Sequence, residues 1–249
     1  MKQTRIAALL CALSLLAGCA SSMQLEATDA KKAAHINAEL GLNYMSQGRH
    51  ELAMEKLQRA LEYDSASADA HHYLAELYRR LERPDKSREH YRRALGLAPK
   101  DASIQNNYGI FLCTDGQYDE GIKYLALAVE NPVWSGRAGA FENLGRCYQD
   151  KGDNGKSEQY YREALQLDAA LPGALLGMAD LSLQQGNTIS SRAFLQRYSA
   201  VALHTPQSLW IGIQVERELG DRNALASYSM LLRNNFPDAE ETQLYLNSK

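Results

Sequence analysis

The residues in this sequence that could do chemistry fall short of complete catalytic motifs. His50-Glu51 begins like a zinc-binding helix, but Met54 stands where the second histidine must be. Asn154-Gly155-Lys156-Ser157 is similar to the end of a phosphate-binding loop, yet Asp150 replaces a glycine that such a loop requires. We therefore expect no catalytic residue, no metal site and no cofactor.

One cysteine near the start of the chain lies in a context that predicts lipid attachment. Lys2 and Arg5 flank the start of an apolar stretch, Ile6–Leu16, that is too short to be a permanent membrane span. Leu16-Ala17-Gly18-Cys19 resembles the bacterial lipoprotein signal, in which cleavage precedes a cysteine that is then acylated. We expect residues 1–18 to be a signal peptide, Cys19 to carry the lipid, and residues 19–33 to form the lipidated N-terminus and tether. The alternative is an ordinary secretory peptide with an incidental thiol at Cys19.

Charge argues against one class of partner. Removing Lys2 and Arg5 with the signal leaves 25 of the 27 basic residues against 30 acidic ones, a mature charge near −5. Such a chain lacks the positive surface that nucleic-acid binding requires. We expect no nucleic acid and no small-molecule substrate among its ligands.

The sequence repeats with a period of 34 residues, which predicts the helices of the chain. Counting from Ala34, small residues and large apolar residues recur at the offsets of the tetratricopeptide pattern. Each copy predicts two antiparallel helices, which bury their apolar faces only by stacking on neighbouring copies. We predict an all-α, right-handed solenoid of about six helix-turn-helix hairpins over residues 34–249. The repeats lie near 34–67, 68–101, 102–137, 138–171, 172–205 and 206–239.

Three irregularities qualify this period. The third copy is two residues longer, and we place the excess in the linker Asn131–Arg137, which contains proline and glycine. Glu82 occupies the turn position that glycine holds in the other copies, so this turn is less ideal. The sixth copy keeps Gly220 and Pro237 and little else of the pattern.

Two cysteines remain in the repeat region. Cys113 and Cys147 lie late in the expected first helices of neighbouring hairpins, which pack side by side. Export would place them in an oxidising compartment, so we predict a disulfide between them. The alternative is two buried thiols that act as small apolar residues.

The surface expected to bind a partner is the groove formed by the first helices of repeats one and two. In tetratricopeptide hairpins, offsets 2, 5, 9, 12 and 13 face the concave side. We therefore expect an apolar strip followed by a polar and charged continuation, made of His35, Ala38, Leu42, Met45, His72, Arg79 and Arg80. Two alternatives remain open. Residues 25–33 of the chain could cover the strip, or it could pack as an ordinary end of the solenoid. The arginines of repeat two could also be simple solvated charge.

The whole chain resembles a family of type IV pilus biogenesis lipoproteins called PilF or PilW. The segments that carry this resemblance, together with the anchor signal, are Ala38–Tyr44, Ser67–His71, Asn106–Gly109, Phe141–Gly145 and Met178–Leu181. The resemblance implies a non-catalytic lipoprotein on the periplasmic face of the outer membrane. It also implies binding to the outer-membrane secretin of the pilus machine, in support of secretin assembly or of pilus stability.

Two other functions are compatible with a repeat array and an anchor. One is an assembly lipoprotein for a different envelope machine. The other is an activator of a cell-wall enzyme, although the sequence holds no catalytic constellation for wall cleavage.

Overall fold

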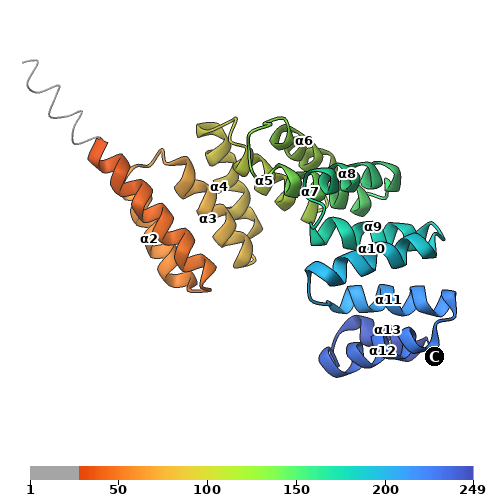
Figure 1. The fold of residues 1–249 in the computed structure, drawn as a ribbon. Coiled ribbons are helices and arrows are strands. Elements are labelled where there is room, and N and C mark those ends of the chain that lie inside the picture. Colours follow the sequence, from red (N-terminus) through yellow and green to blue (C-terminus); the bar gives the residue numbers. More distant parts are fainter. Residues whose placement is uncertain (1–27, 249) are drawn as a thin grey trace, which may run out of the picture. The chain divides into compact units, whose positions relative to one another are not determined.

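Regular structure in the computed structural model, which describes residues 28–248, is entirely α-helical. Residues 28–46 form the first helix, and antiparallel hairpins follow along the chain (Figure 1). The later helices are α2 (His50–Tyr63), α3 (Ala68–Arg80), α4 (Pro84–Leu97), α5 (Ala102–Thr114), α6 (Tyr118–Val129), α7 (Arg137–Asp150), α8 (Asn154–Leu167), α9 (Pro172–Gln184), α10 (Thr188–Val201), α11 (Pro206–Leu219), α12 (Arg222–Asn235) and α13 (Glu240–Asn247). The expected all-α array of hairpins is confirmed.

The repeat starts agree with the helix starts. Helices α3, α5, α9 and α11 begin at Ala68, Ala102, Pro172 and Pro206, which are the residues expected from the period, and α7 begins one residue early. Residues between α6 and α7 hold the excess length of the third copy. There the Asn131 side chain accepts a hydrogen bond from the backbone N–H of Val133, which stabilises the loop after the helix end.

The sixth hairpin is complete although its sequence keeps little of the repeat pattern. Leu209, Ile213 and Leu232 form its buried core. Thr205 and Ser208 form a reciprocal capping box at the start of α11. Helix α13 packs against both α11 and α12. Ile213 and Leu232 stand at offsets 8 and 27, so large apolar residues fill positions where the first four copies have glycine or alanine.

Five of the six hairpin turns within residues 28–248 contain glycine in the left-handed backbone region, with φ between 72° and 89°. An L-residue in this region brings its Cβ close to the following carbonyl, whereas glycine has no Cβ. Glu82 adopts φ 56° at the equivalent position of the second hairpin. This turn therefore keeps the common geometry with a residue that is strained in it.

The first helix also includes residues that the sequence analysis assigned to the tether. Residues 28–33 are helical, so a tether ending at residue 33 is too long. Ala34 is already buried. Cys19 and residues 1–18 lie outside the described part of the chain.

The chain divides into two compact units between Ile104 and Gln105. The core of the first unit is formed by the first helix, α2 and α3. Its buried members are Ala38, Met45, Ala53, Leu57, Ala60, Ala70, Leu74 and Leu77. Helices approach closely where the repeat has glycine. A Cβ added at Gly41 would lie 2.5 Å from a carbon of Leu57, so a larger residue would force this pair of helices apart.

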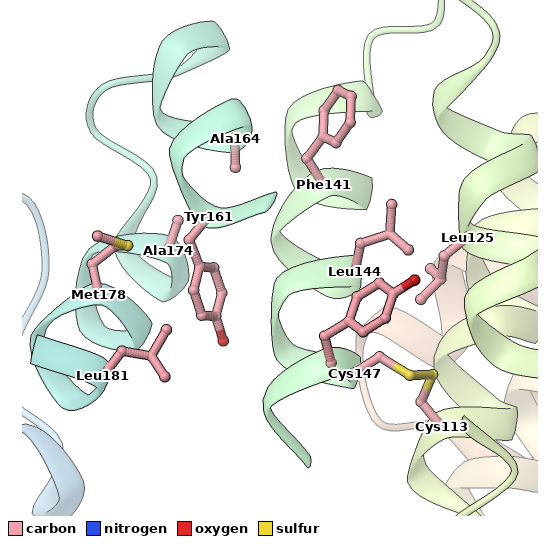
Figure 2. Packing of buried hydrophobic residues seen from close by; sticks show 11 residues of the cluster. Cys113, Leu125, Phe141, Leu144, Cys147, Tyr161, Ala164, Ala174, Met178 and Leu181 are labelled. Carbon is pink, nitrogen blue, oxygen red and sulfur yellow. A yellow bond between two sulfur atoms is a disulfide. The ribbon is translucent and has the colours of Figure 1, made fainter. Parts of the chain in front are cut away.

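The second unit has a core that runs through several hairpins. In Figure 2, Tyr161 lies between the helix that carries Leu144 and the helix that carries Ala174 and Met178. Cys113 of α5 and Cys147 of α7 form a disulfide, with their Cα atoms 5.7 Å apart (Figure 2). This bond joins the first helices of two neighbouring hairpins.

Candidate partner-binding face

The structure separates the residues expected to form one partner-binding groove. Ala38, Met45 and His72 are at most 5% exposed, and the first two belong to the core of the first unit. Leu42 is half-buried. The expected exposed strip of Ala38, Leu42 and Met45 is therefore wrong, because α2 and α3 cover two of its three members.

The other polar members of the predicted groove, His35, Arg79 and Arg80, are at the surface. His35 is exposed, and its Nδ1 lies 3.4 Å from a carboxylate oxygen of Asp69. Arg79 donates a hydrogen bond to Glu76. Arg80 donates to the backbone carbonyl of Met45, so it ties α3 to the end of the first helix. This contact, at 3.3 Å, gives Arg80 a structural role at the surface.

His72 contributes packing instead of a surface contact. Its ring centroid lies 6.1 Å from that of Tyr91, and burial lowers its pKa below the ordinary histidine value. A neutral, buried imidazole is a poor recognition element for a charged partner.

Sequence reasoning missed a different apolar surface on the first helix. Ile36 and Leu40 are 49% and 42% exposed, and the neighbouring Asn43 is also exposed. We call Ile36, Leu40 and Asn43 the first-hairpin face. They stand at offsets 3, 7 and 10 of the repeat.

The equivalent positions in other hairpins are buried. Offset 3 is Ala70 in the second copy, Ala140 in the fourth and Ala174 in the fifth, and each is fully buried. Offset 7 is Leu74, Leu144 and Met178 in the same copies, at most 2% exposed. In each case the second helix of the preceding hairpin, α2, α6 or α8, contacts the first helix that carries these residues. No element within residues 28–248 covers this face on the first helix.

A shallow concavity of about 580 Å³ follows this face. It is lined by His35, Ile36, Glu39, Leu40, Leu42, Asn43 and Ser46. The Glu39 carboxylate accepts a hydrogen bond of 3.1 Å from the Tyr73 hydroxyl, which holds it at one edge. The site is therefore an apolar centre with a polar rim, the usual composition of a protein-binding patch.

The signal for this face was present in the sequence. The first copy has no preceding hairpin among the recognised repeats, so its offsets 3 and 7 should be exposed. Terminal repeats of soluble arrays normally carry polar residues on the outer face. Isoleucine and leucine at these offsets depart from that rule.

The described part of the chain offers no arrangement for metal chemistry. Within residues 28–248, no three histidine, cysteine, aspartate or glutamate side chains are placed to hold an ion. His71 and His90 do face each other, with their Nδ1 atoms 3.0 Å apart. Burial, together with the neighbouring His71, lowers the pKa of His90 to about 4. This pair belongs to the contact between α3 and α4.

Residues 28–248 contain no helix with the length and apolar character needed to cross a bilayer.

The hairpin repeats define a tetratricopeptide scaffold. Models of the tetratricopeptide repeat match residues 38–102 and 138–171. The type IV pilus assembly protein PilF of Pseudomonas aeruginosa is 32% identical over 205 residues, which cover 82% of this chain and 81% of PilF. The chain belongs to the PilF family of tetratricopeptide proteins.

Solved structures support the same assignment. The structure of Pseudomonas aeruginosa PilF has a TM-score of 0.81 and 30% identity, covering 89% of this chain and all of that one. The structure of PilW, described as a widely conserved type IV pilus biogenesis factor, has a TM-score of 0.78 and 29% identity. That match covers 86% of this chain and 98% of PilW. The family resemblance read from the sequence is confirmed.

Proposed function

We propose that this protein is a non-catalytic lipoprotein that binds the secretin of a type IV pilus machine through the first-hairpin face. Cys19 anchors it to the periplasmic face of the outer membrane. Membership of the PilF family supports the role in pilus biogenesis. The exposure of Ile36 and Leu40 is the observation that carries the binding site.

The occupant of this face is an amphipathic helix of the partner. In the second, fourth and fifth hairpins, the corresponding face is covered by a helix of 12 to 14 residues from the preceding hairpin. A partner helix with small and apolar residues on one side covers the first-hairpin face in the same way. This is the helix-in-groove form of recognition.

The strength of the contact follows from the area that it would bury. Full burial of a leucine or isoleucine side chain stabilises by about 1.5 to 3 kcal/mol relative to full exposure. Ile36 and Leu40 are each about half exposed, so docking should gain about 1 kcal/mol from each. Replacing both with glutamate should weaken binding at least about 30-fold.

Capture of the secretin tests this site. In crosslinked membranes, the Ile36→Glu/Leu40→Glu protein should no longer capture the secretin. The same variant, once purified, should keep a helical circular dichroism spectrum and a melting temperature close to those of the wild type. The matched control is Ile189→Glu/Leu203→Glu, which introduces the same charges at strongly exposed apolar positions elsewhere. Normal capture by the first variant, or equal loss in the control, refutes the proposed face.

The same experiment separates the proposed partner from the other partners considered. Capture of a component of a different envelope machine, lost only in the Ile36→Glu/Leu40→Glu variant, would retain the site and replace the secretin as partner. A separate assay of cell-wall degradation tests the activator function, which wall-degrading activity that depends on the added protein would favour.

Lipid anchoring has its own test. Cys19→Ser should leave the precursor unprocessed or release the protein from outer-membrane fractions, because the acyl chains supply the membrane affinity. Unchanged fractionation of this variant would contradict anchoring through Cys19.

A further inference from the structure

Another concavity lies between α8 and α10, the second helices of the fourth and fifth hairpins (Figure 1). It has a volume of about 240 Å³ and is lined by Arg162, Leu165, Gln166, Phe194 and Arg197. We call it the arginine groove and define it by these five residues. Its lining comes from second helices alone, whereas the first-hairpin face lies on a first helix.

Two half-buried apolar side chains form the floor of the arginine groove. Leu165 and Phe194 each pack against both core clusters of the second unit, so the core holds them in place while part of each side chain remains accessible. A floor that is already ordered lowers the entropy that a ligand loses the protein on binding.

Arg197 lies over this floor and has no carboxylate partner. Its guanidinium carbon is 5.6 Å from the centroid of the Phe194 ring, which is a cation–π distance. Its Nη2 donates a hydrogen bond of 3.0 Å to the backbone carbonyl of Ala169. Among the described residues 28–248, Arg197 belongs to no ion pair. Its other N–H groups therefore retain the planar fork that matches a carboxylate.

The second arginine of the groove is already neutralised. Arg162 donates through Nε and Nη2 to one carboxylate oxygen of Glu158, at 3.0 and 2.8 Å. The other oxygen of Glu158 accepts a hydrogen bond of 3.4 Å from the Gln185 amide. Arg197 therefore supplies the positive charge that remains in the groove.

The unit around the groove is acidic. Residues 105–248 contain 11 basic and 17 acidic side chains, a net charge of −6. General electrostatic attraction would therefore bring basic ligands to this unit. A preference for an acidic ligand would have to come from the local contacts of Arg197, so such a preference identifies the groove.

We propose that the arginine groove docks an extended segment of a protein partner, in which a glutamate or aspartate and a leucine-like residue stand two positions apart. Residues at this spacing in an extended chain point to the same side. The carboxylate pairs with Arg197, and the apolar side chain covers Leu165 and Phe194. Arginine and aromatic residues are the types that protein interfaces favour. The contact uses no residue of the first-hairpin face, so it is a second surface beyond the proposed secretin site.

Direct binding of a short peptide tests the proposal. The probe is a rhodamine-labelled repeat of Glu-Gly-Leu-Gly, and its affinity for the purified full chain is measured by fluorescence anisotropy at low salt. Two comparison peptides replace every glutamate with lysine or every leucine with serine. Each replacement should weaken binding at least about fivefold, because one loses the ion pair and the other loses the burial of the floor.

Variants of the protein locate the binding in the groove. Arg197→Gln should weaken binding of the Glu-Gly-Leu-Gly probe about fivefold. Glu158→Gln leaves Arg162 without its partner and should tighten the same binding about threefold, and this gain keeps the test valid if Arg197→Gln does not fold. Arg222→Gln is the matched control, since it removes one exposed cation at the start of α12, and should change the affinity by less than about twofold.

The two binding surfaces of the protein fail separately in this design. The Ile36→Glu/Leu40→Glu variant should bind the probe as the wild type does, whatever its effect on secretin capture. Four results overturn the arginine groove: no binding of the probe to the wild type, equal binding of the lysine peptide, equal loss in Arg222→Gln, or unchanged affinity in both Arg197→Gln and Glu158→Gln.

Discussion

The turn of the second hairpin gives a quantitative test of the repeat architecture. Glu82 adopts φ 56°, whereas the equivalent residue of each other hairpin is a glycine with positive φ. An L-residue in this conformation costs roughly 1 to 2 kcal/mol. Glycine removes that cost but adds about 0.5 to 1 kcal/mol of unfolded-state entropy. Glu82→Gly should therefore raise the free energy of unfolding of the first unit by about 0.5 to 1 kcal/mol.

The charge of Glu82 needs a control because Arg79, Arg80 and Arg83 are close in sequence. Glu82→Ala removes the carboxylate and keeps an L-residue, so the difference between the glycine and alanine variants isolates the backbone conformation. Gly116→Ala provides the reverse change, since an added Cβ there meets no atom within 4 Å. It should destabilise the second unit by a similar amount.

Urea unfolding followed by circular dichroism measures these differences, with melting shifts of about 2 to 4 °C per kcal/mol as a second readout. Equal stability of Glu82→Gly and Glu82→Ala would refute the reasoning. It would mean that the turn tolerates an L-residue without strain.

Two further predictions concern stability. Because the pKa of His90 is lowered to about 4, the unfolded chain binds more protons than the folded chain between about pH 6.5 and 4, so stability falls as the pH falls through this window. His90 is half-buried, so we expect a loss of about 1 to 2 kcal/mol. His90→Gln should lose less stability between pH 7.5 and 5 in urea titrations. An identical loss in both proteins would exclude the histidine pair as the cause. Alkylation without reduction should label neither Cys113 nor Cys147, and two labelled thiols in the mass spectrum would show that the bond is absent. Replacing both cysteines with alanine should lower the free energy of unfolding by up to about 4 kcal/mol through chain entropy, and by less if neighbouring hairpins hold the loop in place.

Much of the local architecture could be predicted from the sequence because the repeat period encodes it. Each hairpin by itself requires a glycine at its turn and a small residue where its two helices pack. This is why the helix starts at Ala68, Ala102, Pro172 and Pro206 agree with the period. The sixth hairpin was less evident, since its core residues Ile213 and Leu232 stand at offsets 8 and 27, where the first four copies have glycine or alanine.

The tertiary structure decided which residues at the repeat positions are exposed to solvent. Leu40 and Leu144 occupy the same offset, yet Leu144 is buried and Leu40 is 42% exposed. The difference arises because burial in a stacked array depends on the neighbouring hairpin and not on the residue itself. For the same reason Ala38 and Met45, which the offsets placed in a groove, lie in the core. The concavity that Glu142, Asp150 and Asp180 line likewise required the fold, because the first two residues belong to α7 and Asp180 belongs to α9, and only the contact between these helices brings them together.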